Sequence, residues 1–282
     1  MQALDNYIKK IKTLPPSPRV LARLLVLLNE ADGHASEIVD LIAFDPALTA
    51  KVLQRCNNAA SGLAGTVTHL DQAVTLVGFD AIYRLVAMVV GEGVLSAKQP
   101  GYGIGTGELW EHSITTAVAA RVIARQLGGD ENLAFTAGLL HDIGKLVLSS
   151  YLEDCQESVV RDTQHSGRSF LEAEQTALGV DHAEIGGLVL EEWSFPENLV
   201  KAVRYHHDPP QARPHEQLAA SVHLGDIIAH FVGQAQGIDS FAVRTQSEAL
   251  EILEISPVEL DTLIIDTDSA LKECAGLIPT AS

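Results

Sequence analysis

The chain has 282 residues, 46% of them hydrophobic, so it can bury a sizeable core in one or two domains. Its 37 acidic residues against 19 basic ones give a formal net charge of −18, which repels polyphosphate backbones and anionic membrane surfaces. The composition therefore disfavours direct nucleic-acid binding and membrane association.

Targeting and redox signals indicate a cytoplasmic protein. The opening stretch MQALDNYIKKIK contains no hydrophobic signal-peptide region. No apolar run reaches the ~18 residues that a membrane-spanning helix needs. The three cysteines, Cys56, Cys155 and Cys274, are far apart and odd in number, which is typical of a reducing compartment rather than of a disulfide framework.

Helical periodicity runs through nearly the whole chain, and no two-residue alternation bounded by turns is evident, so the sequence predicts an all-α protein. Helix starts are marked by Asp45-Pro46, Asp181, Pro196 and Ser256, which are N-cap or first-turn signals. Helix ends or turns are expected at these glycines: Gly78, Gly128, Gly129 and Gly179.

The chain divides into four predicted parts. Residues 1–95 are expected to form an amino-terminal helical layer, and residues 108–235 a helical core. Between them, SAKQPGYGIGTG at 96–107 is rich in glycine and lacks apolar periodicity, so it is either a junction or a flexible loop over a site. Residues 236–282 are expected to form a helical tail without recognisable chemistry, and no fixed-period repeat is present.

The string FTAGLLHDIGKLVL, residues 135–148, places His141 and Asp142 side by side in an otherwise apolar segment. Burying both groups costs several kcal/mol or so unless each finds a partner. A divalent metal ion is one such partner, and a hydrogen-bonded structural pair is the alternative. In a helix His141 and Lys145 share a face, while Asp142 points about 100° away and reaches a shared ion only by extending its carboxylate.

Further residues with metal-ligand chemistry lie on both sides of this pair: Glu108, His112, His182, His206, His207 and Asp226. Each also has a simpler interpretation. Glu108 is a solvated residue one turn before His112, His182 lies in a first helical turn, and His206-His207 end a helix. Asp226 can be an exposed carboxylate with His223 and His230 merely as neighbours.

The order of these residues resembles the ligand order of the HD superfamily of metal-dependent phosphohydrolases, in its longer version that holds more than one metal ion. The local strings are similar to the HDOD branch, a non-classical relative of the HD-GYP cyclic-dinucleotide phosphodiesterases. They are WEHS at 110–113, GLLHDIGK at 138–145, DHAEIGGLVLEEW at 181–193 and AVRYHHDP at 202–209. The amino-terminal helices also resemble the family in LPPSPRVLARLLVLL at 14–28, IAFDPALTAKVLQRCNNAA at 42–60 and AVTLVGFDAIYRLVAMVV at 73–90.

The resemblance implies an HD-like core that holds one or two divalent transition-metal ions, with iron, manganese or zinc as candidates. One ion would use His112, His141, Asp142 and Asp226. A second ion would use His182, His206 and His207, with Asp142 bridging the two. In an active hydrolase Asp142 and Lys145 would be catalytic, because Lys145 would neutralise phosphate charge beside the metal ions.

Two functions follow from the resemblance. The chain has HHDPPQARP at 206–214, where HD-GYP enzymes continue from the double histidine to a substrate-contacting GYP loop. We therefore expect a signal-transduction protein that acts through signalling-protein or small-ligand partners. The alternative is a metal-dependent phosphodiesterase or phosphohydrolase that acts on a cyclic dinucleotide or another small phosphorylated nucleotide.

Overall fold

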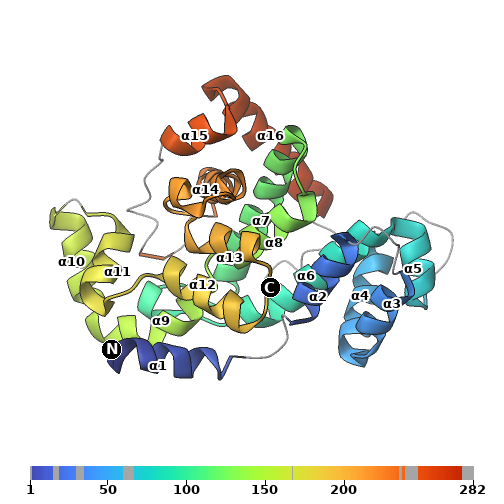
Figure 1. The fold of residues 1–282 in the computed structure, drawn as a ribbon, viewed down its shortest axis with the longest axis horizontal. Coiled ribbons are helices and arrows are strands. Elements are labelled where there is room, and N and C mark those ends of the chain that lie inside the picture. The colour runs from blue at the N-terminus through green and yellow to red at the C-terminus, as the bar shows by residue number, and fades with distance from the viewer. Residues whose placement is uncertain are drawn as a thin grey trace.

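The chain folds as the all-α protein that its periodicity predicts. The computed structural model describes residues 2–14, 19–29, 35–59, 67–166, 168–234, 237–238 and 247–274, and within these ranges it contains helices and one isolated bridge between Gln99 and Ile104 but no strand (Figure 1). The helices are α1 (Gln2–Ile11), α2 (Arg19–Asn29), α3 (Ala35–Ala43), α4 (Pro46–Ala59), α5 (Leu70–Val77), α6 (Phe79–Leu95), α7 (Glu108–Leu127), α8 (Glu131–Leu140), α9 (Lys145–Leu152), α10 (Gln156–Ser166), α11 (Phe170–Leu178), α12 (His182–Glu192), α13 (Glu197–Arg204), α14 (Glu216–Phe231), α15 (Ser247–Leu253) and α16 (Pro257–Cys274), with short 3-10 turns at Pro100–Tyr102, Glu153–Cys155 and Pro209–Ala212.

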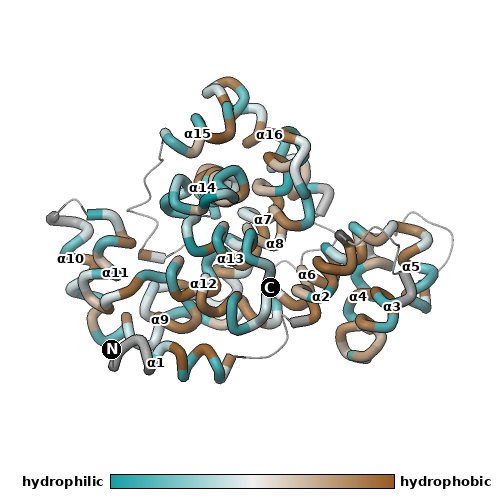
Figure 2. Tube along the Cα trace, viewed as in Figure 1, coloured by the Kyte–Doolittle hydropathy of each residue, from teal (hydrophilic) through white to brown (hydrophobic). Residues whose placement is uncertain are grey.

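Helices α2–α6 form a group at one side of the molecule, and α6 joins this group to the rest (Figure 1). The α6 segment is coloured mostly brown in Figure 2 because it is rich in hydrophobic residues, most of which are buried. Helix α1 lies apart from this group and packs against α9 and α12. Its Tyr7 hydroxyl also donates to the carbonyl of Leu178, the last residue of α11, at 3.1 Å. The predicted domain boundaries remain predictions.

Helices α7, α8 and α14 form the centre of the core, with α7 packed against both of the others. Close approach depends on small residues at the crossings. A Cβ atom on Gly138 would lie 2.8 Å from the Ala117 Cα, and one on Gly225 would lie 3.0 Å from the Thr116 carbonyl oxygen. These crossings bring α7, the end of α8 and α14 close enough together for their polar residues to meet.

The predicted helix starts are confirmed. Asp45 accepts hydrogen bonds from the backbone of Ala47 and Leu48 at 2.9 and 3.0 Å, and Asp181 accepts one from Glu184 at 2.8 Å. Helix α13 begins directly after Pro196, and the Ser256 hydroxyl accepts a bond from the backbone of Glu259 at 3.4 Å at the start of α16. The predicted glycine ends are also found, with left-handed backbone at Gly128 and Gly179.

The HDIGK segment is not the single helix on which the face prediction relied. Helix α8 ends at Leu140 and α9 begins at Lys145, so His141, Asp142, Ile143 and Gly144 form a turn between them. The backbone there closes with i to i−3 hydrogen bonds, such as Lys145 N to Asp142 O at 2.9 Å. Because a tight turn brings residues three apart together, the Lys145 amine contacts Asp142 Oδ2, the same oxygen that the His141 ring approaches.

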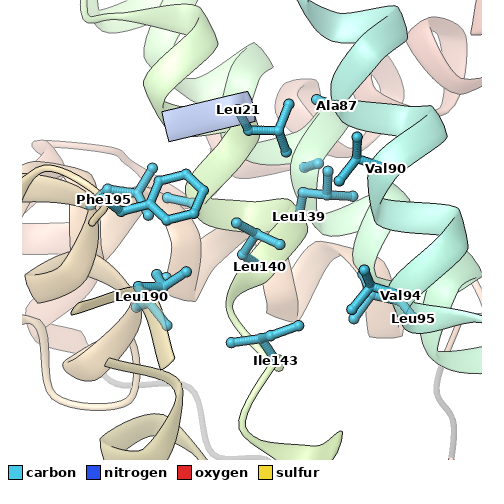
Figure 3. Packing of buried hydrophobic residues seen from close by; sticks show 14 of the residues in the cluster. Leu21, Ala87, Val90, Val94, Leu95, Leu139, Leu140, Ile143, Leu190 and Phe195 are labelled. Carbon is cyan, nitrogen blue, oxygen red and sulfur yellow. The ribbon is translucent and has the colours of Figure 1, made fainter. Parts of the chain in front are cut away.

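Hydrophobic neighbours anchor this turn between the two parts of the molecule. Figure 3 shows Leu139, Leu140 and Ile143 lying between residues of α6 on one side and Leu190 and Phe195 on the other. All three are at most 1% exposed. Packing on both sides therefore holds the turn in one position.

The described helices and cysteines bear on the membrane and redox predictions. No single described helix is both long and apolar enough to cross a bilayer, and α5 and α6 reach that length only as a pair bent by 119°. Cys56 is buried and Cys155 is partly buried, and both are free thiols. The Cys274 side chain lies outside the described residues.

Replacing Gly144 by Ala should destabilise the protein by about 3 kcal/mol or more, because the backbone must shift to accept the new methyl group. Its Cβ would lie 2.0 Å from the His182 carbonyl oxygen and 2.8 Å from the Gly186 nitrogen. The control is Gly93→Ala in α6, where no atom lies within 4 Å of the new Cβ. That variant should gain up to about 1 kcal/mol from helix propensity. Urea unfolding followed by circular dichroism measures both changes, and equal stabilities would contradict the packing argument.

Candidate metal centre

The structure brings the predicted ligands together in the middle of the core. His112 comes from α7, His141 and Asp142 from the turn after α8, and Asp226 from α14. The His112 Nε2 atom lies 3.0 Å from Asp226 Oδ1 and 3.8 Å from Asp142 Oδ2, and His141 Nε2 lies 3.3 Å from the same Asp142 oxygen. These four residues form a compact group with two imidazole and two carboxylate donors.

A second group of histidines lies on the other side of Asp142. His182 opens α12, while His206 and His207 follow the end of α13. The His182 Nε2 atom is 3.4 Å from Asp142 Oδ1 and 2.9 Å from His207 Nε2. Each oxygen of the Asp142 carboxylate thus faces a different set of histidines, and candidate ligand atoms of His182, His206 and His207 lie within 4.8 Å of one another.

The orientation of the rings favours a metal ion. In four of them the Nδ1 atom lies within hydrogen-bond distance of an oxygen that can only accept: His112 with Gln234 O at 3.0 Å, His141 with Gly138 O at 2.8 Å, His206 with Val203 O at 2.7 Å and His182 with Glu174 Oε2 at 2.6 Å. Each Nδ1 therefore carries a proton and each Nε2 is turned towards the cluster.

Two of these Nε2 atoms are buried without a well-aligned hydrogen bond among the described residues, although that of His141 lies 3.3 Å from Asp142 Oδ2. They belong to His141 and His206, whose side chains are 1% and 0% exposed. An unsatisfied polar atom inside a core costs about 1–3 kcal/mol, so such atoms need an explanation. Nitrogen lone pairs that converge beside carboxylates are the donor set that iron, manganese and zinc accept, and the residues therefore fit a transition-metal ion.

Burial and neighbouring charges separate the protonation states of the histidines. Burial favours neutral His182, but the facing Glu174 carboxylate outweighs it and raises the pKa of His182 to about 9. Burial, followed by the charge of His141, lowers the pKa of His206 to about 3. Burial and the His206 ring also hold the pKa of His207 well below its usual value. His206 and His207 are therefore neutral at neutral pH, which is the form that binds metals.

Lys145 is the cation nearest to the shared carboxylate. Its Nζ atom lies 2.7 Å from Asp142 Oδ2, and its side chain is 7% exposed. Burial opposes ionisation of Asp142, but the charges of His141 and Lys145 hold the pKa of that carboxyl well below its usual range. The ammonium group of Lys145 thus compensates a buried negative charge.

The sequence interpretation missed several residues around this centre. His230 was considered only a neighbour of Asp226, yet its Nε2 lies 3.5 Å from Asp226 Oδ1, and the spacing of four residues in α14 could have indicated this contact. His223 is buried beside the cluster. Glu174 contacts His182 from another helix, which no sequence spacing signals. Glu108 instead accepts a hydrogen bond from the Gly105 backbone at 2.6 Å.

The arrangement of helices and of polar residues matches a known family. Residues 14–209 match the model of the HDOD domain. The chain belongs to the HDOD family. The matched region includes the α2–α6 group and the turn that carries His141 and Asp142, and it ends before α14, which carries Asp226.

Solved structures with the same fold cover nearly all of this HDOD protein. A protein of Shewanella amazonensis SB2B with the name "putative phosphohydrolase" has a TM-score of 0.70 and 25% sequence identity, over 97% of this chain and 98% of its own. An HDOD domain protein of Geobacter sulfurreducens has a TM-score of 0.70 and 23% identity, over 97% and 98% of the two chains. The Geobacter protein supports the fold alone.

Curated relatives are longer than this HDOD chain. An "Uncharacterized protein" of Treponema pallidum is 25% identical over 229 residues, which are 79% of this chain and 43% of that protein. Ribonuclease Y of Thermus thermophilus is 28% identical over 207 residues, which are 72% of this chain and 28% of the enzyme. The chain thus spans less than half the length of these relatives.

Replacing His141 by Ala in this HDOD protein should remove the stabilisation that a transition-metal ion held by His112, His141, Asp142 and Asp226 would provide, so the zinc-induced shift should be smaller than in the wild type. An ion at about 100 times its dissociation constant stabilises the native state by about 3 kcal/mol, seen as a higher melting temperature. The matched control is His69→Ala, because His69 is an exposed histidine of the amino-terminal group. Thermal melts of metal-free and zinc-loaded protein measure the shift. An equal zinc-induced shift in wild type and His141→Ala would contradict a role for His141 as a ligand.

Proposed function

We propose that this HDOD protein is a signal-transduction protein whose enclosed metal centre controls the arrangement of its helices. The observation that carries the proposal is the burial of the centre. His141, Asp142 and His206 are 1%, 2% and 0% exposed, and Lys145 points into the group rather than towards solvent. His207 and His230 are partly exposed at its edge, and a centre with this degree of burial is better suited to hold an ion as a structural or sensing element than to admit a phosphodiester chain.

Two sets of residues would hold the ion or ions. His112, His141, Asp142 and Asp226 provide one set of donors. The three histidines His182, His206 and His207 provide the other set, with Asp142 shared between them. Iron, manganese or zinc would suit these donors. Each set draws on three segments, and because Asp142 is shared, two ions would tie together α7, α12, α14 and the turns at 141–142 and 206–207.

A change at the centre would be transmitted to the amino-terminal group through the packed turn. Leu139 and Ile143 flank the His141-Asp142 pair and pack towards α6 (Figure 3). The buried hydroxyl of Tyr83 in α6 also lies 2.5 Å from the Thr136 hydroxyl in α8. Since packed cores deform in discrete steps, a shift of this turn would move α6.

The partners we propose are signalling proteins that contact the amino-terminal group. Phe44, between α3 and α4, is 91% exposed, and Val26 and Leu76 are 40% and 45% exposed. Contiguous apolar surface marks protein contacts, and a partner that covered Phe44 would remove the most exposed of these side chains from water. The net charge of −18 disfavours an RNA partner, although ribonuclease Y is among the relatives.

The second candidate function is a metal-dependent phosphodiesterase that acts on a cyclic dinucleotide or another small nucleotide. It is favoured by the position of Asp142 between the two histidine groups, with the Lys145 amine 2.7 Å away. Bound ions would supply Lewis-acid activation for phosphodiester hydrolysis there. Asp142 would orient the groups around the reacting phosphate, and Lys145 would neutralise its charge.

Two measurements distinguish these functions: phosphodiester hydrolysis by the metal-loaded protein, and the affinity of the variant Lys145→Met for a metal ion. The manganese-, iron- and zinc-loaded protein should show no hydrolysis of bis-p-nitrophenyl phosphate or cyclic dinucleotides above the metal-free background. In Lys145→Met a cation that competes for Asp142 is lost, so the affinity for the metal ion should rise by about tenfold, while the metal-free protein loses stability. Chelator competition measures the affinity.

The control for this variant is Lys201→Met, because the Lys201 amine is partly exposed and pairs with Glu197 at 2.8 Å and with the Arg213 carbonyl, not with a proposed ligand. It should leave the affinity unchanged. Hydrolysis by the loaded wild type that falls about 100-fold in Lys145→Met would instead establish the phosphodiesterase and contradict the regulatory proposal.

A further inference from the structure

Glu174 in α11 is a fully buried carboxylate, at 0% exposure. Both of its oxygens have defined partners. Oε1 accepts a short hydrogen bond from the Tyr102 hydroxyl. Oε2 accepts from the His182 ring Nδ1 at 2.6 Å and from the His182 backbone nitrogen at 3.2 Å. The carboxylate therefore links the glycine-rich loop to the first residue of α12.

The contact with Glu174 fixes which nitrogen of the His182 ring points to the cluster. With Nδ1 donating to the carboxylate, Nε2 points to Asp142 Oδ1 at 3.4 Å and to His207 Nε2 at 2.9 Å. The helix itself does not need Glu174 as a cap, because Asp181 is the N-cap and accepts from the Glu184 backbone. The carboxylate thus acts on the ring of His182 as well as on its backbone.

The loop that carries Tyr102 is held rigidly against the core. Two backbone hydrogen bonds between Gln99 and Ile104, at 2.9 and 3.1 Å, close it, and Gly101 N donates to Ser149 Oγ at 3.1 Å. Tyr102 is 0% exposed, and its ring lies 5.5 Å from the Lys145 amine. The side chain of Tyr102 therefore reaches both Glu174 and the lysine beside Asp142.

Resting on the metal centre proposed above, we propose that Glu174 is the positioning residue of His182 and that Tyr102 holds Glu174 in place. The relay runs from the loop at 99–104, through Tyr102 and Glu174, to the His182 side of the centre. A carboxylate behind a ligating imidazole fixes the tautomer and increases the basicity of the ligand. The loop thereby controls how firmly the three-histidine group holds a metal ion.

The test uses the full chain and Co²⁺ as the probe, because its visible absorption reports the ligands around the ion. Affinity is measured by chelator competition for Glu174→Gln and Tyr102→Phe. The matched controls are Glu92→Gln, which removes a charge paired with Arg55 at 2.6 Å, and Tyr7→Phe, which removes the hydroxyl of another buried tyrosine. Glu92 lies in α6 and Tyr7 in α1, and neither helix carries a proposed ligand.

Glu174→Gln should weaken one Co²⁺-binding step by about 10- to 100-fold and change the absorption of the ion bound in that step. Tyr102→Phe should weaken the same step by a smaller factor, and the two controls should match wild type. If Glu174→Gln does not fold, Tyr102→Phe alone decides the outcome.

The two proposals fail in different ways. Wild-type affinity and an unchanged spectrum in Glu174→Gln and Tyr102→Phe would overturn the relay and leave the metal centre intact, even if melting temperatures fall. The absence of Co²⁺ binding by the wild type would overturn the metal centre and the relay together.

Discussion

The buried carboxylate of Asp142 is the group on which the rest of the core depends. It is 2% exposed and must be compensated by positive charge, because a bare carboxylate in a core is far too costly. Lys145 contacts one of its oxygens at 2.7 Å, and the His182 ring faces the other at 3.4 Å. A bound cation would supply the same compensation with greater charge. An ion at the proposed centre would therefore couple metal binding to folding and to the positions of the surrounding helices.

Glycines at close backbone contacts allow the surrounding helices to approach Asp142. Gly138 and Gly225 let α7, α8 and α14 cross closely, and Gly144 lets the turn after Asp142 touch the backbone of His182. Such contacts tolerate no added methyl group without a shift, so the ligands are held by packed backbone as well as by their side chains. The apolar neighbours of the turn pack towards α6 (Figure 3), which gives the amino-terminal group a direct mechanical link to the centre.

Sequence reasoning succeeded where the determinant is local. Caps at Asp45 and Asp181 depend on adjacent residues, and the all-α class follows from apolar periodicity. It was wrong to treat His141 to Lys145 as one continuous helix, because periodicity does not reveal the tight turn between α8 and α9. Glu174 was missed because its partner His182 begins a different helix, so only tertiary packing brings the two together.

The most direct test of the account is the metal content of the full chain, purified untagged under reducing conditions without chelators and measured by elemental analysis. The convergence of imidazole Nε2 atoms on Asp142 and Asp226 predicts one or two first-row transition-metal ions per chain. A content near zero, even after anaerobic reconstitution with iron, manganese or zinc, would contradict the account. The histidine cluster would then be a structural network without an ion.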